Sequence, residues 1–208
     1  CRRRCVARTK RHALLESVGP TGTVQQVNPG ELELLAVASE AAGCTACGLA
    51  AARTRAVPGN GNPAAKLVLL GEAPGENEDA AGEPFVGRSG RLLDAVLADV
   101  GVRRSDVFVC NAVKCRPPAN RAPSPSELEA CAPFLVRQLQ AVQPRVIVAL
   151  GASAARALGL EFSALGSVRG SVRKLPEDLI ATAPRLAAVH LVVTFHPAYV
   201  LRNRTKHE

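Results

Sequence analysis

The 208-residue sequence contains no methionine, no tryptophan and a single tyrosine. It has no apolar run long enough to span a bilayer, and its charged first residues are not followed by the apolar stretch of a signal peptide. We therefore expect a cytoplasmic protein that does not associate with membranes. Because methionine is absent, we also expect the numbered sequence to lack its true start.

The usual phosphate-binding motifs are absent too. There is no GxxxxGK[ST] and no clean GxGxxG, which disfavours a nucleotide-binding protein. Residues 1 to 15 contain no acid and six basic residues, and without those six charges the formal charge of +8 falls to +2. Net charge is therefore weak evidence for nucleic-acid binding. We expect a basic, flexible extension at residues 1 to 28 and one domain at residues 29 to 208.

Four short apolar runs predict buried strands at residues 66 to 70, 107 to 113, 145 to 150 and 190 to 195. Helical patterns lie between and before them, at residues 31 to 42, 91 to 100 and 125 to 142. The last begins with Ser124 as N-cap, Pro125 at the first position and Glu127 three residues after the cap. Strands that alternate with helices predict a parallel sheet covered on both faces, with a ligand site at the carboxyl ends of the strands.

The predicted strands deliver polar residues to that edge. The first ends at Gly71 and Glu72, the second carries Asn111, and the last is followed by His196. A loop rich in glycine, proline and acids follows the first strand and contains Phe85. A carboxylate, an amide, an imidazole and an aromatic ring are the groups that can hold one planar base. Each of these residues also has a purely structural explanation: Asn111 as an amide at a strand end, Phe85 as a core residue and His196 as a structural histidine. The loop itself is also explained as a surface connection.

Four of the seven cysteines have a spacing that fits a metal centre. Cys44 and Cys47 form a CxxC pair before the first strand, Cys115 follows the second strand, and Cys131 lies in the capped helix. Zinc ribbons use two compact pairs, so the wide second pair favours an iron-sulfur cluster. A thioredoxin-like CxxC and buried free thiols are the alternatives. Cys110 lies inside a predicted strand and is interpreted as a core residue.

Three segments together resemble the iron-sulfur, or family 4, uracil-DNA glycosylases. They are GEAPGENEDAAGEPFVGRSGRLLD from residue 71, NAVKCRPPANRAPS from residue 111 and HPAYVLR from residue 196. The resemblance covers residues 44 to 202. It implies a three-layer α/β/α sandwich with a central four-stranded parallel sheet, a 4Fe-4S cluster on the four cysteines above, and hydrolytic release of uracil from single- or double-stranded DNA. We expect a monomer.

The resemblance also implies roles for individual residues. Asn111 would pair with uracil, Phe85 would stack on it, and Gly71 and Glu78 would lie beside it. The candidate catalytic residues are Glu72, Ala73, Asn120 and His196. The residues expected to contact DNA are Lys114, Arg116, Tyr199, Leu201 and Arg202.

The chain departs from related glycosylases that carry a GQDPYH-type motif. Where those have a water-positioning Asp and a thymine-blocking Tyr, this chain has Ala73 and Gly75. We expect the main chain or Asn120 to place the water, and Glu78 to exclude thymine. Residues 116 to 124 lack the His of relatives that trap the sugar, and no lysine is placed as a nucleophile, so we expect hydrolysis without lyase activity. The alternative is a non-catalytic iron-sulfur module that binds nucleic acid.

Overall fold

Four parallel strands form the centre of a six-stranded sheet in the computed structural model, which describes residues 16–18, 24–26 and 28–203. The strand order is β3-β5-β4-β6-β8-β7, and the central pairs β5-β4, β4-β6 and β6-β8 are parallel. The strands are β3 (Asn60–Gly61), β4 (Leu67–Gly71), β5 (Phe108–Asn111), β6 (Val146–Leu150), β7 (Val172–Lys174) and β8 (His190–Thr194).

The four predicted strands are confirmed as the parallel centre of the sheet. The sequence did not predict the two edge strands, β3 and β7, which pair antiparallel with β5 and β8. β3 has only two residues, and β7 is a polar, largely exposed segment. Neither contains the apolar run that marks a buried strand, so these two strands are recognised only from their pairing with β5 and β8 in the structure.

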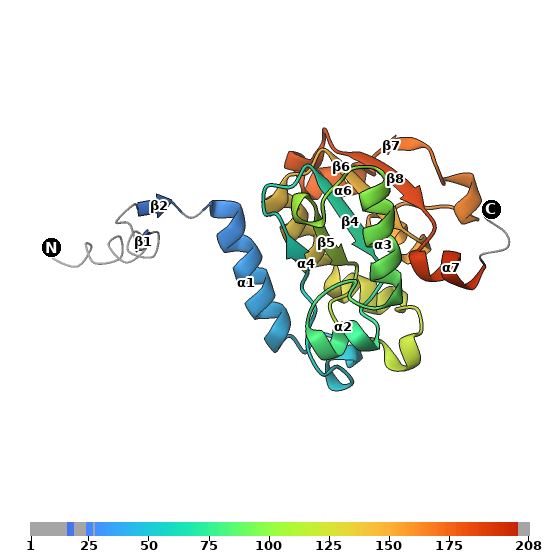
Figure 1. Cartoon of the computed structure of the whole chain (residues 1–208), viewed down its shortest axis with the longest axis horizontal. Coiled ribbons are helices and arrows are strands. Elements are labelled where there is room, and N and C mark those ends of the chain that lie inside the picture. Colours follow the sequence, from blue (N-terminus) through green and yellow to red (C-terminus); the bar gives the residue numbers. More distant parts are fainter. Residues whose placement is uncertain (1–15, 19–23, 27, 204–208) are drawn as a thin grey trace, which may run out of the picture.

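Helices cover both faces of the sheet (Figure 1). The helix that the sequence predicted most clearly begins as expected, because Ser124 Oγ accepts from the Glu127 N–H and the Glu127 carboxylate accepts from the Ser124 N–H. The α-helices are α1 (Pro29–Gly43), α2 (Glu76–Ala81), α3 (Arg88–Asp99), α4 (Pro125–Val142), α5 (Ala152–Ala157), α6 (Glu177–Thr182) and α7 (Pro197–Arg202). Single-turn 3-10 helices lie at Gly48–Ala51, Arg104–Asp106, Pro118–Asn120, Leu165–Ser167 and Pro184–Leu186.

The two faces of the sheet form separate cores because side chains alternate along each strand. On one face, Leu69 and Val109 pack against Leu93 of α3. On the other, Leu70 packs in a larger cluster with Leu135 of α4. α1 packs against the outer side of α4. This arrangement confirms the α/β/α sandwich and leaves the carboxyl ends of the parallel strands open at one edge.

The predicted flexible extension lies mostly outside the described residues. Of residues 1 to 28, the structure describes β1 (Glu16–Val18), β2 (Val24–Gln26) and Asn28. β1 and β2 pair antiparallel, with Val18 opposite Val24, and the sequence did not predict this pair of strands. Among the described helices, none combines the length and the apolar character that crossing a membrane requires.

Candidate active site and metal centre

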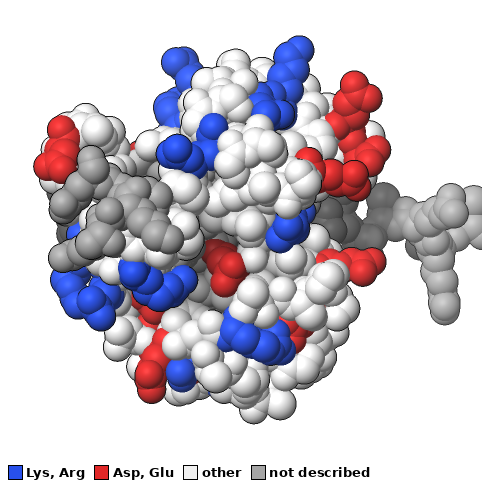
Figure 2. Space-filling view, turned by 90° about the vertical axis from the view of Figure 1, so that its right-hand side faces the viewer, with Lys and Arg blue, Asp and Glu red and all other residues white. Residues whose placement is uncertain are grey.

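A cavity of about 430 Å³ opens at the carboxyl ends of β4, β5 and β8. This is the edge at which the sequence predicts a ligand site. Figure 2 looks onto the α7 side of the molecule and shows basic side chains around a hollow with acidic side chains at its centre. The predicted site residues that line the cavity are Glu72, Ala73, Glu78, Phe85, Asn111, Asn120, His196 and Arg202.

Asn111 ends β5 and is 1% exposed. Its side-chain oxygen Oδ1 is buried and has no hydrogen-bond partner among the described residues. Buried polar atoms are nearly always paired, so an unpaired acceptor in the wall of a cavity indicates a group that awaits a donor. The Asn111 main-chain oxygen, in contrast, accepts from Lys114 Nζ at 2.6 Å.

Gly71, the last residue of β4, makes room for this site. A Cβ at this position would lie 2.3 Å from Asn111 Oδ1 and 2.6 Å from Cζ of Phe85. Any side chain here would therefore push the amide and the aromatic ring apart. Gly71 does not line the cavity itself but lies directly behind the two groups that do.

Phe85 has a left-handed backbone, with φ of +57°. This conformation is a genuine outlier for a bulky residue, and such strain concentrates at functional sites. The Phe85 ring is 6% exposed, and its centroid lies 5.9 Å from that of His196 at an interplanar angle of 33°. The two rings and the Asn111 amide therefore lie close together in one cavity.

His196 is the N-cap of α7. Its Nδ1 accepts from the Ala198 N–H at 3.1 Å, so in the neutral ring the proton is on Nε2. Burial lowers the pKa of His196, and the nearby Glu72 carboxylate only partly offsets this. The ring is therefore a neutral Nε2–H donor at neutral pH.

Glu72, the first residue after β4, has a partner that sequence reasoning missed. The Ser153 hydroxyl, in the first turn of α5, donates to Glu72 Oε2 at 2.5 Å. Ser153 is 8% exposed. It follows β6 by three residues, so the rule that polar residues gather at the carboxyl ends of parallel strands could have identified it. The bond holds one carboxylate oxygen of Glu72 at the first turn of α5.

Asn120 also lines the cavity and has a left-handed conformation, with φ of +54°. Its Oδ1 accepts from Arg116 Nε at 2.8 Å. Arg116 is half-buried, and its guanidinium also lies 3.7 Å from the Glu76 carboxylate. The loop after β5 is thus joined to α2 across the mouth of the cavity.

The four predicted metal-ligating cysteines line one small pocket. Cys44 and Cys47 follow α1, Cys115 follows β5 and Cys131 lies in α4. Main-chain and side-chain N–H groups point at three of the sulfur atoms. Ala46 N donates to Cys44 at 3.5 Å, Lys114 N to Cys131 at 3.3 Å and Arg53 Nη1 to Cys115 at 3.0 Å. Cys110 is fully buried in the core, as predicted.

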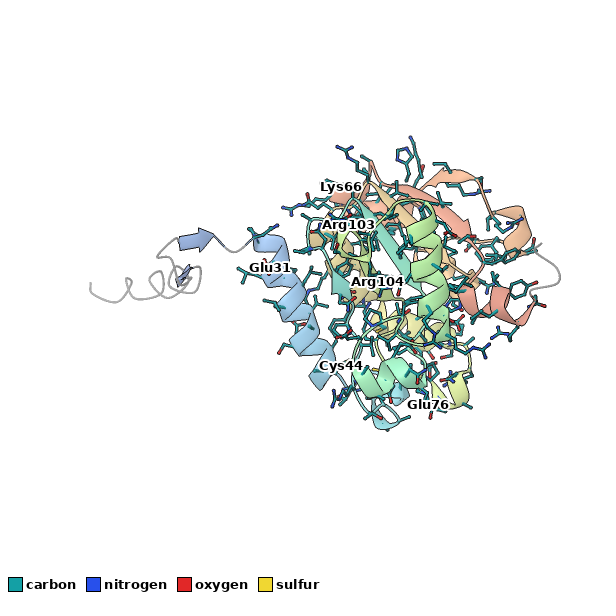
Figure 3. The ribbon with its side chains drawn as sticks, viewed as in Figure 1. Glu31, Cys44, Lys66, Glu76, Arg103 and Arg104 are labelled. Atoms are coloured by element: carbon teal, nitrogen blue, oxygen red, sulfur yellow. The ribbon has the colours of Figure 1, made fainter. Side chains whose placement is uncertain are left out.

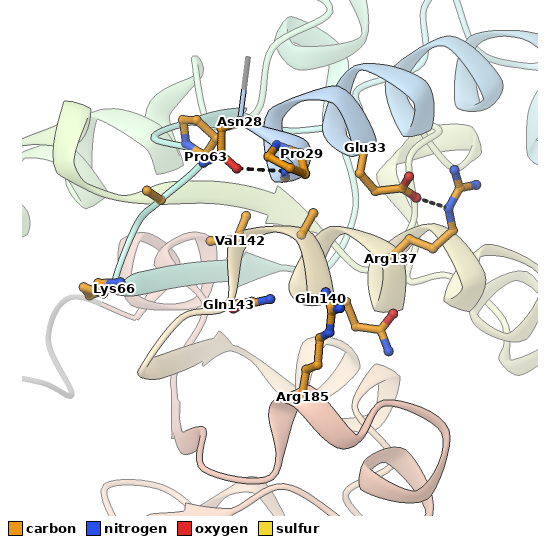
Figure 4. Close-up of a pocket in the computed structure, with 13 residues that line it drawn as sticks. Asn28, Pro29, Glu33, Pro63, Lys66, Arg137, Gln140, Val142, Gln143 and Arg185 are labelled. Carbon is orange, nitrogen blue, oxygen red and sulfur yellow. Dashed lines mark hydrogen bonds and ion pairs between the residues drawn. The ribbon is translucent and has the colours of Figure 1, made fainter. Parts of the chain in front are cut away.

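A second, larger cavity of about 720 Å³ lies at the amino ends of the strands. Its wall includes Lys66, which lies at the opposite end of the molecule from Glu76 (Figure 3). Figure 4 shows this cavity between α1, the end of α4 and Arg185, with Glu33 accepting from Arg137 Nε at 2.6 Å. None of the predicted site residues lines it.

Comparison with known proteins agrees with this geometry. Residues 58–208 match the model of the uracil DNA glycosylase superfamily. The type-4 uracil-DNA glycosylase of Thermotoga maritima is 47% identical over 174 residues, which cover 83% of this chain and 86% of that protein. The chain belongs to the type-4 uracil-DNA glycosylases. The type-4 enzyme of Archaeoglobus fulgidus is 44% identical (79% of this chain, 81% of that protein), and the type-5 enzyme of Thermus thermophilus is 35% identical (68% of each).

The cysteine pocket of this type-4 chain has the donor set of an iron-sulfur site. Four thiols surround it, and N–H groups directed at sulfur are the usual second shell of such clusters. Within the described part of the chain, no three cysteine, histidine or acidic side chains are close enough to bind a single metal ion. A 4Fe-4S cluster would be held by one thiolate from each of the four cysteines, so these sulfur atoms need not converge on a single ion. The four cysteines fit a cluster.

Burial raises the pKa of the Cys115 thiol and of the Cys131 thiol. Without a metal these two groups therefore stay protonated at neutral pH. The positive charge of bound iron would replace the protons, because a metal binds the thiolate form. Metal binding at this pocket must therefore release protons.

The prediction that Lys114 contacts DNA is wrong. Lys114 is 1% exposed, and its ammonium group points inward to the Asn111 main chain. The sequence places it next to Arg116 and Arg121 in what looks like one basic patch. The turn after β5 instead directs the Lys114 side chain into the protein, where no phosphate can reach it.

The other predicted DNA contacts lie at or near the cavity mouth. Tyr199 and Arg202 of α7 are exposed, and Leu201 is half-buried. The Tyr199 ring stacks on Phe195 with centroids 4.8 Å apart. The guanidinium of Arg169 lies 4.7 Å from the Phe195 ring on which Tyr199 stacks.

Glu78 was predicted to exclude thymine. Its carboxylate lines the cavity and accepts three main-chain hydrogen bonds, from Gly75, Val86 and Gly87. The bond from Gly75 is the capping-box contact of α2, whereas the bonds from Val86 and Gly87 join the helix to the loop that follows it and have no local sequence signal.

Proposed function

We propose that this chain hydrolyses the N-glycosidic bond of deoxyuridine in DNA, releasing uracil and leaving an abasic site. The observation that carries this proposal is the unpaired, buried Oδ1 of Asn111 in a cavity that also contains Phe85 and His196. A type-4 uracil-DNA glycosylase is a DNA repair enzyme, and uracil arises in DNA when cytosine loses its amino group. The reaction would therefore begin base excision repair of deaminated cytosine.

Asn111 is proposed to read the flipped base. Its Oδ1 would accept from uracil N3–H while its amide nitrogen donates to O4. Cytosine presents an acceptor at N3 and a donor at its 4-amino group, so it would mismatch at both positions. A site built to pair polar atoms discriminates strongly because the wrong base leaves buried groups unpaired.

Phe85 and His196 are proposed to act on the same base. Stacking of a base on an aromatic ring is worth ~1–3 kcal/mol. The neutral Nε2–H of His196 would donate to uracil O2, where negative charge develops as the glycosidic bond stretches. His196 would therefore contribute mainly to the transition state, and Phe85 to binding and orientation.

The attacking water is proposed to lie near Glu72, Ala73 and Asn120, all of which line the cavity. Ala73 offers only its main chain. The Ser153 bond fixes one oxygen of Glu72, and Asn120 is fixed by Arg116. If the bond breaks before the water attacks, the sugar cation needs little help from a base, and positioning by these groups is sufficient.

DNA is proposed to lie across the face formed by the loop after β5 and by α7. Arg116 and Arg202 would meet phosphates, and Tyr199 and Leu201 would enter the gap left by the flipped base. Phosphate contacts would dominate affinity and make it depend on salt.

Cys44, Cys47, Cys115 and Cys131 are proposed to hold one 4Fe-4S cluster. The cluster would serve as a cross-link between the end of α1, the loop after β5 and α4. No step of the base excision passes through it. The cluster would lie beside Lys114, in the turn that follows Asn111 at the end of β5.

Oligonucleotides with a single uracil, thymine or cytosine test the function. The parent protein should release only uracil, as seen by alkali cleavage at the abasic site. Asn111→Asp should lose most uracil excision and gain a trace of cytosine excision, because a carboxylate can accept from the cytosine amino group. Asn62→Asp is the matched control, since Asn62 Oδ1 accepts from Ala64 N and Asn62 does not line the cavity. Binding of uracil-DNA without release of any base would instead support the non-catalytic module.

A further inference from the structure

Glu78 connects the two loops that form the floor of the cavity. One carboxylate oxygen accepts from the Gly75 N–H at 3.1 Å, at the start of α2. The other accepts from the Val86 N–H at 3.0 Å and the Gly87 N–H at 2.8 Å. Val86 and Gly87 directly follow Phe85, so the second oxygen holds the main chain at the residue whose ring lines the cavity.

Phe85 needs such a restraint. Its left-handed backbone is unfavourable for a bulky side chain and persists only where surrounding contacts over-determine it. The packing behind it is close: a Cβ at Gly90 would lie 1.7 Å from the Phe85 main-chain oxygen. Close packing against Gly90 restrains the main chain of Phe85, and the Glu78 bonds restrain the next two residues, Val86 and Gly87.

We propose that Glu78 is a positioning residue for the reaction, which holds the Phe85 ring at the stacking position through the Val86 and Gly87 main chain. This rests on the proposed function, because it assumes that Phe85 stacks on a base. The carboxylate itself need not touch the base. Its two oxygens already accept three N–H groups, and ionised carboxylates accept such bonds strongly.

The neighbouring residue provides a matched control. Asp79 is also in α2, is 3% exposed and also accepts main-chain N–H groups, but from Thr54 and Arg55. Those bonds join α2 to the segment before β3 and not to the segment that carries Phe85. Truncating Asp79 removes the same kind of interaction from the same helix without touching the segment that carries the ring.

Excision kinetics test the proposal through a double-mutant cycle. Glu78→Ala should lower the single-turnover rate on uracil-DNA by about 10²-fold, the typical cost of misplacing a reacting partner by 1 Å. Affinity for the same DNA should stay within about twofold, because phosphates dominate it. Glu78→Gln keeps one oxygen for Val86 and Gly87 and should recover most of the rate. In a Phe85→Leu background, Glu78→Ala should cost less than about threefold, because the ring through which it acts is absent.

A fluorine signal provides a readout that does not need activity. The chain has five phenylalanines, so 4-fluorophenylalanine gives few resonances, and the one lost in Phe85→Leu is that of Phe85. Glu78→Ala, and to a smaller degree Glu78→Gln, should shift or broaden this resonance. In Asp79→Ala, the Phe85 resonance and the excision rate should both equal those of the parent within error. The visible absorbance of the cluster is checked in every variant.

Three results would overturn the proposal. They are an unchanged fluorine resonance in both Glu78 variants, rate losses that add fully to that of Phe85→Leu, or equal effects of Asp79→Ala and Glu78→Ala. Full additivity would mean that Glu78 meets the base directly, as in thymine exclusion. If Glu78→Ala does not fold, two measurements on Glu78→Gln test the proposal instead. They are the Phe85 fluorine resonance and the double-mutant cycle of Glu78→Gln with Phe85→Leu. A parent protein that excises no uracil would refute the proposed function, whereas the resonance would still report whether Glu78 holds Phe85.

Discussion

Lys114 Nζ donates a 2.6 Å hydrogen bond to the main-chain oxygen of Asn111, inside the protein. The main-chain N–H of the same lysine donates to Cys131 Sγ, and its carbonyl accepts from Val57 N at 2.7 Å. One buried residue therefore contacts the cysteine pocket, the segment after the CxxC pair and the residue proposed to read the base. Lys114 lines the cysteine pocket and is hydrogen-bonded to Asn111, which lines the active-site cavity.

Replacing Lys114 with Met keeps the volume but removes the donor. We expect the free energy of unfolding to fall by about 1–3 kcal/mol, the usual cost of leaving a buried polar group unpaired. Thermal denaturation under anaerobic conditions should show this as a lower Tm, by roughly 2–4 °C for each kcal/mol. Lys66→Met is the control, because Lys66 is exposed. A variant as stable as the parent would mean that desolvating the ammonium cancels its bond.

Gly71→Ala tests the close approach behind the cavity. The added Cβ would lie 2.3 Å from Asn111 Oδ1 and 2.6 Å from the Phe85 ring, so both groups must move. We expect the single-turnover rate on uracil-DNA to fall by about 10²-fold with a folded protein. Gly166→Ala is the control, because nothing lies within 4 Å of its Cβ position. A Gly71→Ala enzyme with the parent rate would show that the site tolerates a shifted amide and ring.

His196→Ala separates chemistry from binding. Loss of one donor to a developing oxyanion typically lowers the rate by ~10²–10³. We expect this loss in single-turnover excision, with the affinity for uracil-DNA within a fewfold of the parent. Rate and affinity measured on the same duplex provide the comparison. Equal losses in both would assign His196 to DNA positioning.

The pH dependence of excision should reflect the neutral state of His196. Burial holds its pKa below the ordinary value of 6.5, so the neutral form still predominates at pH 6.5. Protonation of Nδ1 at lower pH would break the bond from the Ala198 N–H. We expect the single-turnover rate to fall at low pH with a midpoint below 6.5, and this fall to be absent in His196→Gln. A midpoint at or above 6.5 would contradict a neutral donor.

Cys131→Ser should abolish the cluster. We expect the brown colour, iron and acid-labile sulfide of anaerobically purified protein to disappear, and the Tm to fall, because Cys131 anchors α4 to the proposed cross-link. Cys110→Ser is the control, since this buried cysteine lies in the sheet core and not in the cysteine pocket. Stoichiometric zinc without iron in the parent protein would reject a cluster.

The sequence predicted the sheet centre and the main helices because their signals are local. Apolar runs mark β4, β5, β6 and β8, and Ser124 with Glu127 marks the start of α4. The rule that ligands bind at the carboxyl ends of parallel strands then brought Asn111 and His196 to one place. Those two residues line the same cavity.

The remaining features depend on contacts between distant residues. The burial of Lys114 follows from the turn after β5, which no property of the lysine reveals. Ser153 meets Glu72 only because β6 lies beside β4 in the sheet. The left-handed conformation of Phe85 precedes two main-chain N–H groups that donate to Glu78, and that contact is set by the folded loop. Periodicity and composition do not encode such relationships.

The position of the cysteines has a consequence for how the protein matures in a cell. Cys44 and Cys47 leave the ribosome first, whereas Cys131 follows only after β4 and β5 have been made, an interval of several seconds at roughly 5–20 residues per second. During synthesis the first pair of thiols is therefore available to stray metal before its partners exist. The complete set of proposed ligands forms only when α4 has packed against α1, so we expect iron and sulfide to be bound no earlier than that packing step.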